Sequence, residues 1–397
     1  MRILMISDVY FPRVNGVSTS IQTFRQHLLA LGHEVTLIAP EYPQPHVDDN
    51  SIIRIPSRYV PLDPEDRMLK YSSVLELTEE LRRRSFDIIH IQTPFVAYYA
   101  GIELAKRLGI PRVITYHTLF EEYLYNYISF LPKSWLRLAA RRFSATQCND
   151  VDAVIVPSTP IETRLREYGV TTGMVRLPTG IDLRSFTKGD GERFRFENDI
   201  PLNRPTLLYV GRVAHEKNIE FLLQMLTEVR QLIPEVLLII AGEGPALKKL
   251  YRLTNKLGLG ENVLFIGYLD RNEALLDCYR AADGFVFASR TETQGLVLLE
   301  AMALGVPVVS TAILGTADIL KPGCGALIAE DNIEHFAEQV VELLNNPQLR
   351  ERLGWQAQVY VKEWSASSCA EEMVTLYQQV MVQQSAVANR LVEPNII

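Results

Sequence analysis

Short apolar runs alternate with amphipathic stretches along the whole chain. In the first half, the apolar runs lie at 2–7, 34–40, 87–92, 112–117 and 153–158, and helical patterns ending in glycine lie at 18–32 and 101–109. Strands of a parallel sheet that is covered on both faces are apolar throughout, as these runs are. Alternation of such strands with helices predicts an α/β fold with a doubly wound parallel sheet.

The same alternation repeats in the second half. Its apolar runs lie at 206–211, 236–242, 262–267, 284–289 and 306–310, and its helical patterns at 217–231, 245–258, 272–281, 296–304 and 333–344. The stretch between the halves is rich in charge, Gly and Pro, which is typical of a domain linker. We therefore expect two Rossmann-like domains, at 1–186 and 205–364, joined by a linker at 187–204.

Composition narrows the class of function. The 397 residues are 47% hydrophobic and 22% charged, which is ordinary for a globular protein. A net charge of −7 argues against general nucleic-acid binding, because that function needs a basic face. The cysteines show no CxxC spacing or histidine pairing, so we expect buried thiols in a reducing compartment and no metal cluster; they are Cys148, Cys278, Cys324 and Cys369.

The apolar run in the N-terminal stretch MRILMISDVYFP is too short for a signal peptide, and it matches a first buried strand. No run approaches 18 apolar residues, the length of a membrane-spanning helix. We expect a cytoplasmic protein, or one that lies on a membrane surface.

Ligands of open α/β sheets bind beyond the carboxyl ends of strands, so the loops after the strands are the places to search. The first such loop contains Asn15-Gly16, and Ser18 or Thr19 can cap the helix that follows. A glycine at a helix start lets backbone N–H groups approach an anion closely. An ordinary strand–helix turn explains this loop equally well.

The loop after the first strand of the second half, GRVAHEKN (211–218), carries two bases at a helix start. Gly211 permits close approach of a ligand, Arg212 can fork onto phosphate oxygens, and Lys217 acts as a point charge. We expect these bases to bind phosphate.

Two further loops carry weaker signals. AGEGP (241–245) lacks the full glycine pattern of a nucleotide site. The backbone past Tyr268 and Leu269 can frame a flat base, although a turn capped by Asp270 or Asn272 explains that stretch as well.

Two glutamates, Glu292 and Glu300, follow the fourth strand of the second half. On one helix, positions eight apart differ by about 80° and lie about 12 Å apart along the axis, so the pair does not share a face. Gly295 places a helix start between them, with the N–H groups of Thr293, Gln294 and Gly295 at its positive end. We expect Glu292 to accept hydrogen bonds from a polyol, and Glu300 from a ribose diol.

In the first half, His117 lies at a strand end, where a functional role is favoured over a structural one. Asp150 and Asp152 form a DxD pattern, which holds a divalent metal in some transferases. They precede a strand instead of following one, so a strand-entry turn is the better interpretation.

Together these motifs resemble the retaining glycosyltransferases of family 4, and the resemblance covers nearly the whole chain. The matching stretches, in order, are the first loop, VPSTPIETRLREYGV (156–170), LPTGIDLRSF (177–186), GRVAHEKN, GEGP and residues 267–309, which contain the E-x7-E element. The resemblance implies a GT-B fold, with two Rossmann-like domains facing across a cleft. It also implies a final helix, at about 365–385, that packs back on the first domain.

The resemblance implies specific roles. The diphosphate of a nucleotide-sugar is held by Arg212 and Lys217 and by the amide of Gly16 from the other domain. Glu292 and the amides after it bind the sugar, Glu300 the ribose, and the loop at Tyr268–Leu269 the base. The implied donor-binding set is Gly16, Gly211, Arg212, Lys217, Tyr268, Leu269, Glu292, Thr293, Gln294, Gly295 and Glu300. The implied catalytic set is His117, Arg212, Lys217 and Glu292.

The implied reaction is a hexosyl transfer in which a nucleotide diphosphate leaves. Stabilisation of the leaving charge by preorganised cations and dipoles is its main requirement. The resemblance suggests front-face attack, with the leaving phosphate oxygen taking the acceptor's proton. It implies no protein nucleophile, no metal in the active site and no cofactor besides the donor substrate.

A narrower resemblance concerns the acceptor. The stretch 114–132 and the TETQG sequence, with Gln294, look like the diacylglycerol glucosyltransferases, which implies UDP-glucose as donor and diacylglycerol as acceptor. Residues 119–143 combine aromatic and basic residues, as interfacial helices do on anionic membranes. The expected acceptor or membrane contacts are Tyr116, His117, Tyr123, Tyr127, Lys133, Trp135, Arg137 and Arg141.

Other interpretations stay open. Residues 119–143 can instead form a core helix with a solvated basic side, and the acceptor can be a polysaccharide or lipopolysaccharide intermediate receiving a hexose or mannose. A nucleotide-sugar epimerase and a sugar receptor without chemistry are less favoured. The segment 115–143 argues against the first, and the absence of a signal peptide against the second.

Overall fold

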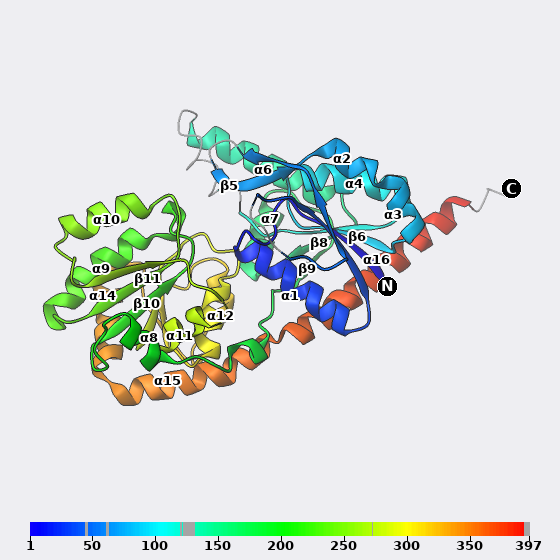
Figure 1. The fold of residues 1–397 in the computed structure, drawn as a ribbon. Coiled ribbons are helices and arrows are strands. Elements are labelled where there is room, and N and C mark those ends of the chain that lie inside the picture. Colours follow the sequence, from blue (N-terminus) through cyan, green and yellow to red (C-terminus); the bar gives the residue numbers. More distant parts are fainter. Residues whose placement is uncertain (44–46, 61–62, 120, 122–131, 272, 393–397) are drawn as a thin grey trace. The chain divides into compact units, whose positions relative to one another are not determined.

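The computed structural model (Figure 1) describes the chain except for residues 44–46, 61–62, 120, 122–131, 272 and 393–397. It divides into two compact units: unit 1 consists of Met1–Gly180 and Ala366–Ile397, and unit 2 of Ile181–Ser365. Each unit is built on a parallel sheet with helices between successive strands, so the predicted α/β class with doubly wound sheets is confirmed.

The sheet of unit 1 has the strand order β3-β2-β1-β6-β7-β8-β9 among the described residues, and all of its pairs are parallel. Its strands are β1 (Arg2–Ile6), β2 (Glu34–Pro40), β3 (Ile52–Ile55), β6 (Ile88–Ile91), β7 (Arg112–Thr115), β8 (Ala153–Val156) and β9 (Met174–Arg176). The five predicted strands are all present. The edge strands β3 and β9 were not predicted, because they are short and only partly buried.

Helices and a hairpin connect these strands. The helices of unit 1 are α1 (Gly16–Ala30), α2 (Tyr71–Glu76), α3 (Thr78–Arg84), α4 (Val96–Leu108), α6 (Lys133–Asn149), α7 (Thr159–Glu167) and α16 (Ala366–Val392). An antiparallel hairpin, β4 (Ser57–Val60) and β5 (Asp63–Leu69), follows β3.

Helix α16 belongs to unit 1 although it lies at the end of the sequence. It packs against α1 and crosses it (Figure 1), and its residues Met373 and Tyr377 share a buried core with Phe24 and Leu28 of α1. The Tyr377 hydroxyl lies 2.6 Å from Nδ1 of the buried His90 on β6. The C-terminal helix therefore completes the core of the N-terminal unit.

The sheet of unit 2 has the order β12-β11-β10-β13-β14-β15 among the described residues and is also parallel throughout. Its strands are β10 (Thr206–Val210), β11 (Leu237–Ala241), β12 (Val263–Gly267), β13 (Gly284–Phe287), β14 (Val308–Ser310) and β15 (Ala326–Ile328). The helical segments of unit 2 are η1 (Leu183–Phe186), α8 (Gly191–Glu197), η2 (His215–Lys217), α9 (Ile219–Leu232), α10 (Leu247–Lys256), α11 (Ala274–Arg280), α12 (Leu296–Ala303), α13 (Thr316–Ile319), α14 (Ile333–Asn345), α15 (Pro347–Tyr360) and η3 (Val361–Trp364).

The linker expected at 187–204 is not a linker in this structure, because these residues lie inside unit 2. Helix α8 packs on α11, and a Cβ added to Gly191 would lie only 2.4 Å from the carbonyl oxygen of Arg280. The Arg193 guanidinium pairs with the Asp277 carboxylate of α11. The glycine and charges that suggested a flexible linker are therefore used for close packing and ion pairing.

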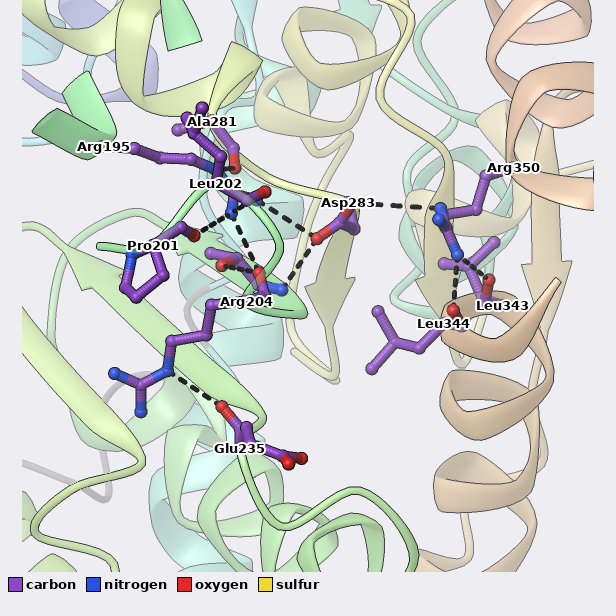
Figure 2. Close-up of polar contacts among 11 residues, drawn as sticks. Arg195, Pro201, Leu202, Arg204, Glu235, Ala281, Asp283, Leu343, Leu344 and Arg350 are labelled. Carbon is purple, nitrogen blue, oxygen red and sulfur yellow. Dashed lines mark hydrogen bonds and ion pairs between the residues drawn. The ribbon is translucent and has the colours of Figure 1, made fainter. Parts of the chain in front are cut away.

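A buried arginine, Arg195, connects the segment 187–204 to the ends of two strands of the sheet (Figure 2). Arg195 is 7% exposed, and it donates to Asp283 Oδ2 at 3.2 Å. It also donates to four carbonyl oxygens at 2.9 to 3.1 Å, those of Ala281, Pro201, Leu202 and Arg204. One side chain thus joins α8, the approach to β10 and the approach to β13.

Within the described residues, no helix is both long enough and apolar enough to cross a membrane.

Candidate functional site

The strand order of unit 2 reverses between β10 and β13, which are adjacent in the sheet and parallel. In open α/β sheets this reversal leaves a crevice at the carboxyl ends of the two strands, and ligands bind there. The loops that leave the two strands carry residues 211–218 and 288–295. These are the loops in which sequence motifs predicted phosphate and sugar contacts.

An ion pair joins these two loops. Lys217 Nζ lies 2.6 Å from Glu292 Oε1, and both side chains are largely buried. The neighbouring backbone is held as well, since Asn218 Nδ2 donates to the Ala288 carbonyl at 3.0 Å and Thr291 Oγ1 to the Glu216 carbonyl at 3.4 Å. The structure therefore brings together two residues that the sequence placed in separate motifs.

Arg212 follows Gly211 at the end of β10. Its guanidinium lies 3.8 Å from Glu216 Oε1, and its carbonyl accepts a hydrogen bond from the Tyr209 hydroxyl at 3.2 Å. The pKa of Tyr209 is raised well above its usual value, chiefly by burial and further by the Glu292 and Glu216 carboxylates. Carboxylates and cations are thus interleaved at this strand end.

Glycines allow the neighbouring loops to pack closely. A Cβ on Gly242 would lie 2.0 Å from the Gly211 carbonyl oxygen, and one on Gly244 would lie 2.4 Å from that of Val213. The weak AGEGP motif thus has a packing explanation, because its glycines let the loop after β11 lie against the loop after β10. Sequence reasoning left this question open.

The loop at 291–295 leads into α12 and is supported from behind. Gly295 has a φ of 101° and precedes the helix, as expected from the sequence. The Gly315 amide donates to the Glu292 carbonyl at 2.9 Å, and a Cβ on Gly315 would lie 2.0 Å from the Thr293 carbonyl oxygen. This support from the loop after β14 was missed, although Gly315 follows a strand end as the other site glycines do.

Glu300 lies in the second turn of α12 and is 3% exposed. Its Oε1 pairs with the Arg271 guanidinium, and its Oε2 accepts a hydrogen bond from the Tyr279 hydroxyl at 2.9 Å. Arg271 comes from the loop after β12, beside Tyr268 and Leu269. Sequence reasoning missed both partners, because neither belongs to a motif and they lie 29 and 21 residues away along the chain.

Unit 1 has its own reversal of strand order, between β1 and β6. The Asp8 carboxylate lies there and accepts hydrogen bonds from Thr93 Oγ1 and the Ala97 amide, both at 2.9 Å, and from the Leu69 amide at 3.2 Å. Burial raises the pKa of Asp8 to about 6. Asp8 thereby joins the loops after β1 and β6 to the end of β5, a role that its position after a buried strand could have suggested.

His117 lies just past β7, at the same edge of the sheet. Its Nε2 is 2.9 Å from Gln92 Oε1 at the end of β6. Burial lowers the pKa of His117 to about 4 and that of the neighbouring His90 to about 3, so both imidazoles are neutral at pH 7. His117 is thus available as a hydrogen-bonding group and not as a cation.

The first loop of unit 1 ends where α1 begins, at Gly16. The expected caps Ser18 and Thr19 are wrong, because Asn15 caps the helix by accepting from the Ser18 amide at 2.8 Å. Among the described residues, no atom lies within 4 Å of a Cβ added to Gly16. Packing of the described residues therefore does not require a glycine at this helix start.

The segment expected to meet a lipid is described only in part. Tyr123 and Tyr127 lie outside the described residues, and Lys133 is the first residue of α6. Tyr116 is buried and its hydroxyl lies 2.9 Å from Ser144 Oγ, so it is an interior residue and not a surface contact.

The outer face of α6 carries exposed apolar residues. Trp135 is 73% exposed and Leu138 is 53% exposed, while Leu136 and Ala140 face the interior. At about 100° per residue, Trp135, Leu138 and Arg142 fall within a stripe about 60° wide. An aromatic residue, a leucine and a base therefore share the outward side, as on interfacial helices.

Glu121 lies beside this face and forms ion pairs with the arginines around it. It is buried and pairs with Arg141 at 2.6 Å, and it lies 3.8 Å from Arg137 and 3.9 Å from Arg164 of α7. The Arg141 guanidinium also lies over the Tyr168 ring, 5.5 Å from its centroid. Several cations around one carboxylate leave an excess of positive charge.

Asp150 and Asp152 act at the amino ends of strands, as expected for a strand-entry turn. The Arg112 amide donates to Asp152 Oδ2 at 2.8 Å, and Arg112 Nε donates to the Asp150 carbonyl at 2.7 Å. In the part of the chain that the structure describes, no cluster of His, Cys, Asp or Glu is suited to hold a metal. The four cysteines are buried free thiols.

Comparison with known families matches both halves of the chain. The family described as Glycosyltransferase Family 4 matches residues 14–185, and the family Glycosyl transferases group 1 matches residues 190–359.

Curated relatives align over most of the chain. It is similar to the alpha-monoglucosyldiacylglycerol synthase of Streptococcus pneumoniae, with 36% identity over 78% of this chain and 71% of that protein. A protein of the same name from Acholeplasma laidlawii is 28% identical over 95% of this chain and 96% of its own. A GDP-mannose-dependent alpha-mannosyltransferase of Mycolicibacterium smegmatis is 27% identical over 97% of this chain and 99% of its own.

Solved structures share the fold at lower identity. Sucrose-phosphate synthase from Thermosynechococcus elongatus superposes with a TM-score of 0.78 at 23% identity, covering 96% of this chain and 99% of that chain. Anabaena HepE in complex with UDP-glucose superposes with a TM-score of 0.74 at 17% identity, covering 97% of this chain and 100% of that chain.

Proposed function

The chain belongs to the glycosyltransferases of family 4, with a GT-B fold, and on this premise we propose that it transfers glucose from UDP-glucose to diacylglycerol at a membrane surface. A nucleotide-sugar donor follows from the family. The choice of sugar and acceptor is supported by similarity to two alpha-monoglucosyldiacylglycerol synthases.

The observation that carries the transfer reaction is the Lys217–Glu292 pair at the strand-order reversal of unit 2. A glycosyl donor presents a diphosphate and a polyol next to each other, so its site needs a cation and a hydrogen-bond acceptor next to each other. In the proposal, Lys217 and Arg212 hold the diphosphate, and Glu292 accepts hydrogen bonds from the sugar. In the proposal, the ion pair holds both groups in position before the donor binds.

In the proposed reaction, the bond between the anomeric carbon and the phosphate oxygen breaks, and negative charge grows on the diphosphate. In the proposal, Lys217 and Arg212 stabilise that charge, and preorganised charges of this kind supply the largest part of many rate enhancements. The leaving phosphate oxygen takes the proton of the acceptor hydroxyl, which attacks the same face of the sugar. His117, neutral at pH 7, is proposed to position the donor sugar and the acceptor.

The donor and the acceptor are tested together on the purified full-length chain. We expect UDP-glucose to raise the midpoint of thermal unfolding more than GDP-mannose does, since a ligand at 100 times its Kd stabilises by about 2.7 kcal/mol. Radiolabelled glucose should then appear in diacylglycerol presented in vesicles. Transfer of mannose, or transfer only to water-soluble glycans, would identify the alternative hexosyl- or mannosyltransferase. Hydrolysis or epimerisation without any acceptor would contradict a transferase.

The outer face of α6 supports the membrane part of the proposal. We expect the protein to float with vesicles that contain phosphatidylglycerol more than with vesicles of phosphatidylcholine alone, because bases near the surface attract anionic lipid. Replacing Trp135 and Leu138 together by alanine should reduce flotation severalfold, since the apolar area available for burial is lost.

Helix α15 of unit 2 provides a matched control for this experiment. Trp355 and Val359 are 65% and 45% exposed, one turn apart, but they belong to no proposed contact. Their double alanine variant should float as the parent does. Absence of flotation, combined with good activity on a water-soluble acceptor, would contradict the membrane proposal.

A further inference from the structure

Glu300 is a single charged residue in an otherwise apolar helix. Its neighbours Leu298, Leu299, Ala301 and Met302 are all buried, and Glu300 is buried with them. Removing a carboxylate from water costs several kcal/mol unless partners compensate, and a buried ion pair is seldom more stable than apolar residues of the same shape. Stability alone therefore does not explain a glutamate at this position.

Two side chains from separate elements fix the Glu300 carboxylate. The Arg271 guanidinium, from the loop after β12, pairs with Oε1, and the Tyr279 hydroxyl, from α11, donates to Oε2 at 2.9 Å. Tyr279 is fully buried, and its ring lies 5.8 Å from that of Phe285 on β13. Arg271 presents a rigid planar fork, which restrains the plane of the carboxylate as well as its position.

These two partners leave half of the carboxylate's capacity for hydrogen bonding. An ionised carboxylate has about four lone-pair sites, and Arg271 and Tyr279 use one on each oxygen. The remaining site on each oxygen can accept one hydroxyl. Two acceptors about 2 Å apart in a fixed plane match the vicinal 2′- and 3′-hydroxyls of a ribose.

We propose that Arg271 and Tyr279 are positioning residues that orient Glu300 to accept both ribose hydroxyls of the donor, and that this cluster selects ribonucleotide over 2′-deoxyribonucleotide donors. The inference rests on the proposed function, because it takes the nucleotide-sugar to bind at these strand ends. It goes further in assigning the choice of sugar in the nucleotide to two residues outside the known motifs.

The location of Arg271 agrees with this role. Tyr268, in the same loop, is 54% exposed. Burial raises the pKa of its hydroxyl, and the nearby charge of Arg271 opposes that rise. Arg271 therefore links the loop expected to frame the base with the glutamate expected to bind the ribose. A base and its ribose are bonded to each other, so their contacts have to be held at a fixed separation.

The test compares UDP with 2′-deoxy-UDP by isothermal titration calorimetry on the full-length chain. We expect the parent to bind UDP about 10- to 100-fold more tightly, the usual contribution of a hydrogen bond to a charged acceptor. Arg271→Met and Tyr279→Phe should each weaken UDP binding more than 2′-deoxy-UDP binding, because 2′-deoxy-UDP keeps only the 3′-hydroxyl that Glu300 accepts. The ratio of the two Kd values then moves toward 1. Arg271→Lys keeps the positive charge but loses the planar guanidinium, so its ratio of Kd values should lie between those of the parent and of Arg271→Met.

The ratio separates positioning from a general structural role, since damage to the fold would raise both Kd values equally. Tyr279→Phe removes a single hydroxyl, so it keeps the test usable if Arg271→Met does not fold. Arg184→Met is the control, because Arg184 is an exposed arginine of unit 2 paired with Asp182 at 3.0 Å, and both of its Kd values should match those of the parent.

The possible results are distinct. Parallel changes in both Kd values, or an unchanged ratio in Arg271→Met and Tyr279→Phe, would overturn the inference. If Glu300→Gln alone loses the discrimination, Glu300 binds ribose without help from its neighbours, and the proposed transferase stands while this inference fails. If the parent binds neither UDP nor GDP and transfers no sugar, the proposed function itself fails.

Discussion

Replacing Lys217 by alanine is expected to lower the turnover number by a factor of about 10² or more, and Arg212→Ala should do the same. Loss of one preorganised group that stabilises transition-state charge has an effect of this size, equivalent to about 2.7 kcal/mol. The structure adds a second reason for Lys217, because its removal leaves Glu292 without the partner that lies 2.6 Å away. The measurement is a steady-state assay of sugar transfer, with kcat and KM determined for the donor.

The same unit offers a matched control. Lys249 of α10 pairs with Glu220 of α9, also at 2.6 Å, but both side chains are exposed and both lie within helices, not in the loops after the strands. Lys249→Ala removes the same kind of ion pair and should leave kcat unchanged. Near-normal turnover in both Lys217→Ala and Arg212→Ala would show that the phosphate is held elsewhere.

A double-mutant cycle separates the two roles of Lys217. If Lys217 acts partly by positioning Glu292, the Lys217→Ala/Glu292→Ala variant should lose less activity than the two single variants combined. The reason is that the effects of mutating two residues in contact do not add. Full additivity would indicate that each residue meets the donor independently.

Replacing Arg195 by methionine should destabilise unit 2 by about 3–5 kcal/mol. Arg195 donates to four carbonyl oxygens and to Asp283 from a site that is 7% exposed (Figure 2), so its loss removes these hydrogen bonds and the cation paired with Asp283. Breaking a buried pair by removing one partner costs this much. The largest structural effect is thus expected at the amino ends of the strands, away from the loops that follow them.

Tryptophan fluorescence can report this loss for unit 2 alone. The chain has three tryptophans, and Trp355 and Trp364 belong to unit 2. A Trp135→Phe background therefore makes urea unfolding report on that unit. Arg184→Met is the control, since its pair with Asp182 is exposed to solvent and surface ion pairs contribute little to stability. A change in unfolding free energy below 1 kcal/mol for Arg195→Met would contradict the role assigned to it.

Most of the central elements could be predicted because burial constrains them strongly. A parallel strand covered on both faces has to be apolar at every position, so β1, β2, β6, β7 and β8 stand out in the sequence. Edge strands are free of this constraint. The strand β9 has exposed residues and was not predicted, and the hairpin of β4 and β5 was missed as well.

The stretch at 187–204 shows why composition misled. Glycine and charge are typical of linkers, but they are also what a tightly packed helix crossing and a buried ion network require. Gly191 is needed because a carbonyl oxygen lies too close for a Cβ, and Arg195 is used because it donates to the carbonyl oxygens that surround it. Local composition cannot distinguish these cases, since the partners are residues 277–283, far along the chain.

By itself, the sequence determined the α/β class, the position of each site loop after a strand, and the types of residue that those loops carry. Only the tertiary structure decided which of these residues meet. Lys217 faces Glu292 because β10 and β13 are neighbours at a reversal of strand order, and Glu300 is held by Arg271 and Tyr279 because α11, α12 and the loop after β12 converge. The physical reason is that apolar periodicity records which residues are buried, whereas the pairing of polar groups depends on strand order and on loops distant in the chain.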